Sequence, residues 1–172
     1  MTERRLIVCD LETSSLGADA IVLEIAAVAL DGEEFRVVPF LPPGSLAKAD
    51  PMALSINRYY ERKVWADQLE DADGNNNAYS WLYAMLEGNV FAGSNPAFDA
   101  PKIAKLIGGE PWHYRLADVS AYAAGVLGIP PTELPGLNKV CELLGVVNDD
   151  PHSALGDARA TAECFRRLMD MK

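Results

Sequence analysis

The chain has 172 residues, of which 49% are hydrophobic and 23% are charged. These values are ordinary for a globular protein, so we expect a single domain over residues 1–172. No apolar run reaches the roughly 18 residues of a membrane span, so no membrane segment is expected. The first apolar stretch ends in charge at Asp10 and is too short for a secretory signal.

The chain carries 15 basic and 25 acidic residues, for a net charge of −10. Proteins that coat duplex nucleic acid are usually basic, so this balance argues against such a protein. It does not exclude a nuclease, because metal ions supply local positive charge at a short nucleic-acid end. The three cysteines lie far apart without a CxxC pair, which argues for a reducing interior. We therefore expect a cytoplasmic protein.

Apolar periodicity predicts an α/β protein with a mixed sheet. The expected strands cover residues 5–10, 21–30, 35–41, 89–92 and 114–117. The expected helices cover residues 50–56, 78–87, 97–107, 119–127, 137–144 and 154–169. Asp31-Gly32 marks a hairpin turn between the second and third strands, and Asp50 is the expected N-cap of the first helix. The very polar window 67–77 is expected to be an exposed loop.

Two carboxylates, Asp10 and Glu12, stand where the first strand ends. Side chains two apart in an extended chain leave on the same face, so these two repel each other unless a cation lies between them. Hard divalent ions such as Mg²⁺ are held by carboxylate oxygens of this kind. Taken alone, the pattern is also that of a solvated turn.

A second polar group follows the strand that ends near residue 92. Asn95 is placed to cap the next helix, with Pro96 behind it. Asp99 lies in the first turn, where a carboxylate also compensates the helix dipole, and Phe98 has the alternative of a core position. These residues can therefore have purely structural roles as well as functional ones.

The third group contains His152, in the loop before the last helix, and Asp157, about one and a half turns later. A loop histidine by itself is more often a surface residue, and His113 is interpreted that way. The three groups together are far more specific, because their order lets four carboxylates and one histidine converge at one end of a sheet. That set suits phosphodiester cleavage with two metal ions about 4 Å apart and a histidine that takes the proton from water.

In these motifs the chain resembles the DEDDh family of 3′→5′ exonucleases, whose relatives include polymerase proofreading subunits and oligoribonucleases. The resemblance covers about residues 6–168, including the stretches 21–26 and 136–145. It implies an α/β, RNase H-like exonuclease fold with a mixed five-stranded sheet flanked by helices. The implied activity is metal-dependent release of 5′-nucleotides from single-stranded 3′ ends of DNA or RNA. The resemblance leaves open whether the protein works with a polymerase partner or as a homodimer.

The resemblance also implies roles for the motif residues. Asp10, Glu12 and Asp157 correspond to ligands of a first Mg²⁺ or Mn²⁺ ion. Asp10 also corresponds to a ligand of the second ion, which Asp99 assists through water. His152 corresponds to the general base.

Substrate binding falls to residues beside these ligands. The backbone around Thr13 is similar to the segment that holds the 3′-hydroxyl, and Leu16 and Phe98 match positions that pack the terminal bases. Asn95, in the second motif, is assigned to the same substrate-binding set.

The chain departs from the family pattern at three positions. Ser15 replaces a common glycine, Ser94 replaces a common histidine, and Pro101 lies early in the middle helix. These departures predict a different turn near Leu16 and a kinked or delayed helix that re-aims Asp99. None removes a metal ligand.

Two groups of basic residues offer either a substrate contact or a solvated face. The first group is Arg58, Arg62 and Lys63, after the first helix, and the second is Lys102 and Lys105.

Two alternative functions remain at this point. One is a non-catalytic interaction module with an exonuclease fold, although such domains tend to lose ligands that are all present here. The other is a phosphatase of the haloacid dehalogenase type, since Asp10-Leu11-Glu12-Thr13 approaches its D-x-D-x-T loop. That family needs Asp at the second acidic position.

Overall fold

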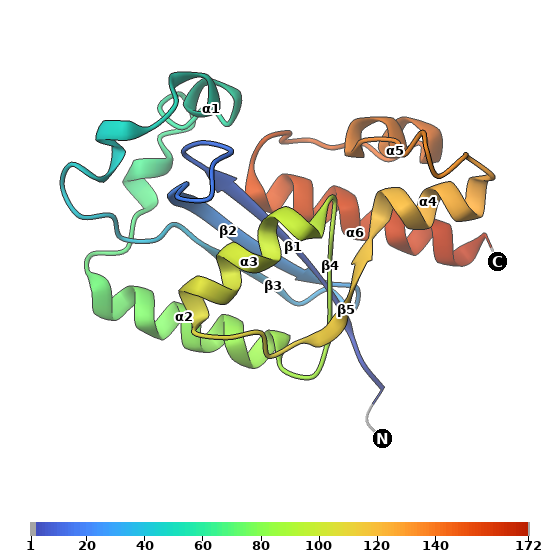
Figure 1. Cartoon of the computed structure of the whole chain (residues 1–172), viewed down its shortest axis with the longest axis horizontal. Coiled ribbons are helices and arrows are strands. Elements are labelled where there is room, and N and C mark those ends of the chain that lie inside the picture. The colour runs from blue at the N-terminus through green and yellow to red at the C-terminus, as the bar shows by residue number, and fades with distance from the viewer. Residues whose placement is uncertain (1–2, 172) are drawn as a thin grey trace.

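A five-stranded sheet lies at the centre of the computed structural model, which describes residues 3–171 (Figure 1). Its strand order is β3-β2-β1-β4-β5. The strands are β1 (Leu6–Thr13), β2 (Val22–Ala29), β3 (Glu34–Val37), β4 (Val90–Gly93) and β5 (His113–Asp118). β1, β2 and β3 are antiparallel neighbours, whereas β4 runs parallel to both β1 and β5. The predicted mixed sheet of five strands is confirmed.

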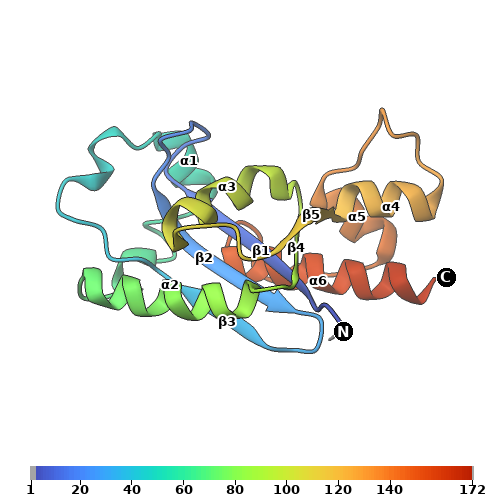
Figure 2. The same cartoon turned by 60° about the horizontal axis from the view of Figure 1, so that its bottom comes forward.

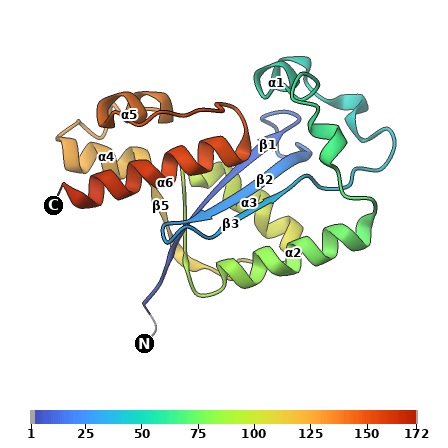
Figure 3. The same ribbon diagram turned by 180° about the vertical axis from the view of Figure 1, so that it is seen from behind.

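Helices cover both faces of this sheet (Figures 2 and 3). They are α1 (Pro51–Ile56), α2 (Ala72–Leu86), α3 (Pro96–Ile107), α4 (Val119–Leu127), α5 (Leu137–Leu144) and α6 (Ala154–Asp170), with short 3₁₀ helices η1 (Ser45–Lys48) and η2 (Val64–Asp67). α2 and α3 pack on the face that contains Ile7 and Phe91, and α4, α5 and α6 pack on the face that contains Val8 and Val28. No helix within residues 3–171 is both long and apolar enough to cross a membrane.

Alternate side chains of β1 point to opposite faces of the sheet, and this alternation decides which helices each side chain faces. Ile7, Cys9 and Leu11 are buried on the α2/α3 side. Val8 is buried on the opposite face, and by the same alternation Asp10 and Glu12 leave toward α6. β1 runs to Thr13, three residues beyond the end we predicted, so both acids stand within a paired strand and not in a turn.

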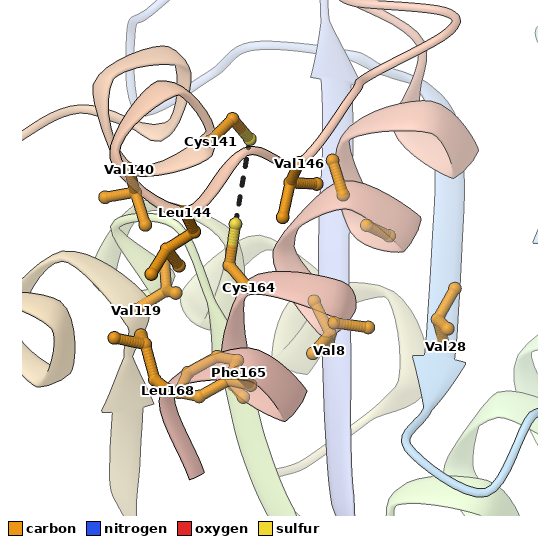
Figure 4. Close-up of a cluster of buried hydrophobic side chains, with 14 of the residues drawn as sticks. Val8, Val28, Val119, Val140, Cys141, Leu144, Val146, Cys164, Phe165 and Leu168 are labelled. Atoms are coloured by element: carbon orange, nitrogen blue, oxygen red, sulfur yellow. Dashed lines mark hydrogen bonds between the residues drawn. The ribbon is translucent and has the colours of Figure 1, made fainter. Parts of the chain in front are cut away.

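The core beneath α6 fixes this helix on the sheet (Figure 4). Val8 and Val28 from the sheet meet Phe165 and Leu168 of α6. The thiols of Cys141 and Cys164 touch within this cluster, with 3.7 Å between their sulfur atoms. All three cysteines are buried and free, as the absence of a disulfide framework predicts.

Most element positions are confirmed, including the boundaries of α4 and α5. Asp50 caps α1 by accepting a hydrogen bond from the Met52 amide at 2.9 Å. The hairpin turns at Gly32, whose φ of 100° is accessible to glycine at little cost.

The prediction of an exposed loop over residues 67–77 is wrong from residue 72 onward, because α2 begins at Ala72. α2 ends at Leu86, one residue before the predicted end of the 78–87 helix. Asp71 caps it by accepting from the Gly74 amide at 2.8 Å. Asn75 in its first turns exchanges two hydrogen bonds with the backbone of Phe40, at 2.7 and 3.1 Å. The strand expected over 35–41 is shorter than predicted, since β3 ends at Val37, before Pro39.

Candidate active site

Three carboxylates meet where β1 approaches the first turn of α6. Ligand oxygens of Asp10, Glu12 and Asp157 all lie within 4.8 Å of one another. Asp10 and Glu12 are two residues apart on one face of β1, and Asp157 lies one turn into the helix that packs on that face. The fold therefore brings together residues separated by almost the whole chain.

The electrostatics of this carboxylate cluster are unfavourable without a cation. Burial raises the pKa of Glu12 to about 8, and the charges of Asp157 and Glu24 act in the same direction. Burial, followed by the charges of Asp99 and Asp157, raises the pKa of Asp10 well above its usual range. Among residues 3–171, no Lys, Arg or His nitrogen lies within 4.0 Å of the cluster's oxygens. Such a set of unneutralised oxygen donors fits a divalent cation.

Asp157 is oriented by the segment that precedes α6. Burial raises its pKa, whereas the hydrogen bond from Asn148 (Nδ2 to Oδ1, 2.5 Å) and the charge of His152 lower it. Asn148 was not identified from the sequence as a site residue.

Asp99 lies beside the cluster but outside the group of three. It is 4% exposed, and burial raises its pKa to about 7 against the lowering effects of the Leu11 backbone N–H and the Lys102 charge. The Leu11 interaction lies at the edge of β1 beyond its pairing with β4, which ends at Val8 and Ala92. The Asp99 side chain therefore lies near a part of β1 that is not paired with β4.

The turn between β4 and α3 sets the position of Asp99. A Cβ atom at Gly93 would lie 2.9 Å from the carbonyl oxygen of Cys9, so glycine permits this close approach to β1. Asn95 follows in the left-handed conformation, with φ 62°, and precedes α3 without making a side-chain cap. Asn95 therefore occupies the N-cap position that the sequence indicated, but without the side-chain hydrogen bond of a cap. α3 begins at Pro96 and continues through Pro101, so the predicted delay of its start is wrong.

His152 lies in an exposed loop, with a φ of 61°. Its carbonyl oxygen accepts a hydrogen bond from Nη1 of Arg62 at 3.1 Å. The same loop is folded against α6: the hydroxyl of Ser153 donates to the Asp150 carbonyl at 2.9 Å and accepts from the Gly156 amide at 3.0 Å. The side chain of His152 thus leaves a loop whose backbone is held on both sides.

A pocket of about 220 Å³ opens next to Glu12. It brings together three of the four predicted substrate-binding residues, Thr13, Leu16 and Phe98, and does not include Asn95, which is exposed on the turn before α3. Leu16 is 86% exposed at the rim. The Thr13 carbonyl accepts from Asn57 at 3.2 Å, which ties the strand end to the segment after α1.

The turn at Ser15 needs no glycine. Ser15 does not adopt a left-handed backbone conformation, and its carbonyl accepts from the Thr13 hydroxyl at 2.8 Å. Its own hydroxyl accepts from the Gly17 amide at 3.3 Å. Local hydrogen bonds therefore stabilise the loop that carries Leu16, in spite of the departure from the family pattern.

Glu24 and Arg62 form a buried support that sequence reasoning missed. Glu24 is completely buried on β2, opposite Glu12 in the strand register, and is paired with Arg36 and Arg62. The available signal was one charged residue inside the apolar strand 21–30. Because Arg62 is paired with the buried Glu24, its charge is neutralised within the protein.

His113 lies at the other end of the sheet from the carboxylate cluster. It begins β5, which runs parallel to β4, and so lies at the opposite end of these strands from Asp118. The carboxylate cluster lies at the other end of the sheet, beyond the C-terminal end of β4.

Comparisons with known proteins agree with this geometry. The RNase T family model, described as "Exonuclease", matches residues 7–165. No curated protein sequence matches the chain.

Several solved nuclease structures share the fold. Cell-death related nuclease 4 (CRN-4) is 16% identical, with a TM-score of 0.70 over 97% of this chain and 64% of that one. A 3′-exonuclease that recognises the end of the histone mRNA stem-loop is 11% identical, with a TM-score of 0.65 over 96% of this chain and 81% of that one. Exonuclease X in complex with 5′ overhanging duplex DNA is 17% identical, with a TM-score of 0.63 over 96% and 91%. The chain thus spans less than two thirds of CRN-4 and most of the other two.

Proposed function

The chain belongs to the RNase T exonuclease family, and from this premise we propose that it is a 3′→5′ exonuclease. It would remove 5′-nucleotides from single-stranded ends of DNA or RNA, as a single domain. The observation that carries this proposal is the cluster of Asp10, Glu12 and Asp157 beside the pocket that contains Thr13, Leu16 and Phe98.

The cluster supports a site for two Mg²⁺ or Mn²⁺ ions. Asp10, Glu12 and Asp157 would hold one ion, and Asp10 with Asp99, through water, the other. Bound divalent ions supply charge stabilisation to the attacking and leaving oxygens of a phosphodiester. The raised pKa values of Asp10 and Glu12 support the assignment, because a bound cation would offset the cost of burying these charges and their mutual repulsion, which together raise the pKa values.

His152 is proposed as the general base that takes a proton from the attacking water. Its exposure leaves the imidazole free to reach a substrate, and the lowering effect of its charge on the pKa of Asp157 supports this role. The held backbone of its loop limits how far the ring can move away. A positioned base of this kind contributes a factor of roughly 10²–10⁴ to a rate.

The pocket beside Glu12 is proposed to bind the terminal nucleoside. Its apolar side chains offer surfaces for a base of any identity, since each base has a π-face. The backbone at Thr13 would hold the 3′-hydroxyl, with the strand end fixed by Asn57.

The direct test uses short single-stranded DNA and RNA oligomers of matched sequence, labelled at the 5′ end. We expect a ladder of shortened products in Mg²⁺ or Mn²⁺ that EDTA abolishes. A single labelled product in place of the ladder would contradict the proposal. Cleavage that persists in EDTA would contradict it as well. Binding without cleavage would instead favour the interaction module. The family match gives no support to the phosphatase alternative.

A further inference from the structure

Asn148 connects the loop before α6 to the carboxylate cluster. Its side-chain nitrogen Nδ2 donates a hydrogen bond to Oδ1 of Asp157, one of the three clustered acids, at 2.5 Å. A hydrogen bond whose acceptor is an ionised carboxylate is stronger than one between neutral groups. None of the catalytic, metal-binding or substrate-binding roles proposed above uses Asn148, so this contact asks for a role of its own.

A local turn decides which end of the Asn148 amide faces Asp157. The side-chain oxygen of Asn148 accepts a hydrogen bond from the backbone N–H of Asp150 at 3.3 Å, which is the pattern of an Asx turn. Because this oxygen is engaged with the backbone, the side-chain nitrogen faces Asp157 as a donor. The amide is thus held in the orientation that attracts a carboxylate.

The turn that contains Asn148 is itself held in place. The Asp150 carboxylate pairs with Arg58, with 2.6 Å between Oδ1 and Nη2, and the Asp150 carbonyl oxygen accepts from the Ser153 hydroxyl at 2.9 Å. Burial raises the pKa of Asp157, whereas the Asn148 amide and the backbone N–H of His152 both lower it. Both ends of the segment 148–152 therefore interact with the Asp157 carboxylate.

The residue type at position 148 suits the cluster. Asn148 is followed by Asp149 and Asp150, and of these three consecutive residues only the one that contacts Asp157 is uncharged. An aspartate at position 148 would bring a further carboxylate against three that already lie within 4.8 Å of one another. An amide of the same size makes the contact without adding negative charge.

We propose that Asn148 is a positioning residue, which holds the Asp157 carboxylate in the orientation that binds a divalent cation. This inference rests on the proposed function. A ligand that is already oriented by a hydrogen bond loses less conformational freedom on binding, so the cation is bound more tightly. Hydrogen-bond partners of metal ligands typically contribute a factor of about 10–100 to metal affinity.

The direct test measures Mn²⁺ affinity without nucleic acid. Titration of the whole chain with Mn²⁺, followed by the electron paramagnetic resonance signal of the free ion, gives the dissociation constant. For Asn148→Ser we expect this constant to rise about tenfold. Serine still offers an acceptor to the Asp150 N–H but lacks the amide that donates to Asp157.

Asn89→Ser is the matched control. The Asn89 side chain accepts from the Arg5 amide at 3.0 Å and donates to the Met85 carbonyl at 2.8 Å, next to the start of β4 and at the far end of that strand from the cluster. The same substitution there should leave the Mn²⁺ dissociation constant unchanged. An unchanged constant for Asn148→Ser, or an equal rise for both variants, overturns the inference.

The metal dependence of the rate distinguishes positioning of a ligand from a general loss of structure. At limiting Mn²⁺ the Asn148→Ser variant should cleave a single-stranded oligonucleotide about tenfold more slowly than the wild type, and excess Mn²⁺ should restore kcat to within about twofold. Excess Mn²⁺ should not restore His152→Ala. A loss in Asn148→Ser that excess Mn²⁺ leaves uncorrected overturns the inference.

An NMR measurement in EDTA separates this inference from the proposed function. The side-chain amide signals of Asn148 are those missing from the ¹H–¹⁵N spectrum of Asn148→Ser. Asp157→Ala, which removes the acceptor, should shift them more than Glu12→Gln does. Equal shifts, or none, overturn the inference even if the chain is an active exonuclease. The expected shift together with no Mn²⁺ binding by the wild type would refute the proposed metal site instead.

Discussion

Arg62 and Glu24 form an ion pair at the base of the candidate site, with 2.9 Å between Nη2 and Oε2. The same guanidinium donates to the carbonyl oxygens of Asn57 and His152, at 3.2 and 3.1 Å. Asn57 holds the end of β1 through Thr13. One side chain therefore connects a buried carboxylate, the strand that carries two acids of the cluster and the loop of the proposed base.

Loss of Arg62 should be strongly destabilising. Arg62→Ala would leave the buried Glu24 with Arg36 as its remaining ion-pair partner, and we expect a loss of about 3 kcal/mol in the free energy of unfolding. Urea denaturation measures this value. Arg159→Ala is the control, because its pair with Glu34 is largely exposed and should contribute less than about 1 kcal/mol. Similar losses for both variants would contradict the role given to Arg62.

Asp157→Ala should abolish cleavage and leave the fold intact. Removal of one of three mutually repelling carboxylates should raise the melting temperature in EDTA or leave it unchanged. Added Mn²⁺ should stabilise the wild type but not the variant. Asp149→Ala, an exposed carboxylate in the preceding loop, serves as the control. A variant at Asp157 with nearly normal activity would show that the metal assignment is wrong.

The stability of the metal-free protein should fall as the pH rises. The pKa of Glu12 is about 8 and that of Asp99 about 7 in the folded protein, whereas their ordinary values are 4.5 and 3.8. Between these limits the folded state binds more protons than the unfolded state, so the free energy of unfolding decreases with pH. Urea denaturation in EDTA at pH 5.5 and pH 8 measures the slope, which Glu12→Gln should reduce. A slope of opposite sign for the wild type would refute this prediction.

Gly156→Ala should disturb the loop of His152. A Cβ atom at this position would lie 2.1 Å from the carbonyl oxygen of Asp150, so the loop must move. We expect a loss of about 1–3 kcal/mol in stability, as for other overpacked sites, together with lower kcat. Gly125→Ala, in α4 with nothing within 4 Å of its Cβ position, should instead stabilise the protein by about 0.5–1 kcal/mol. Thermal melting and steady-state kinetics of both variants give the comparison.

His152→Ala should lower kcat by roughly 10²–10⁴-fold and leave Mn²⁺ affinity unchanged. Isothermal titration calorimetry with Mn²⁺ measures the affinity, and single-turnover kinetics measures the chemical step. His113→Ala should change neither, because His113 lies at the start of β5. A large fall in Mn²⁺ affinity for His152→Ala would identify this residue as a ligand.

The parts of the fold that depend on local pattern could be predicted from the sequence. The two-residue spacing of Asp10 and Glu12 fixes their common face, and the helical period places Asp157 at the start of α6. The start of α2 could not be predicted, because asparagine at position 75 is by itself typical of a loop. The hydrogen bonds that hold Asn75 in the helix go to the backbone of Phe40, 35 positions earlier in the chain. The pairing of Glu24 with Arg62 spans 38 positions and has no local signal.

The end of β1 continues past its pairing with β4. An unpaired strand edge of this kind can form hydrogen bonds with a strand of another chain. Here two side chains occupy that edge: Asp99 interacts with the Leu11 backbone N–H, and Asn57 donates to the Thr13 carbonyl. A foreign strand would have to displace these side chains before it could pair there. The sheet therefore keeps an opening for a ligand beside the carboxylates while part of its free edge is guarded against another strand.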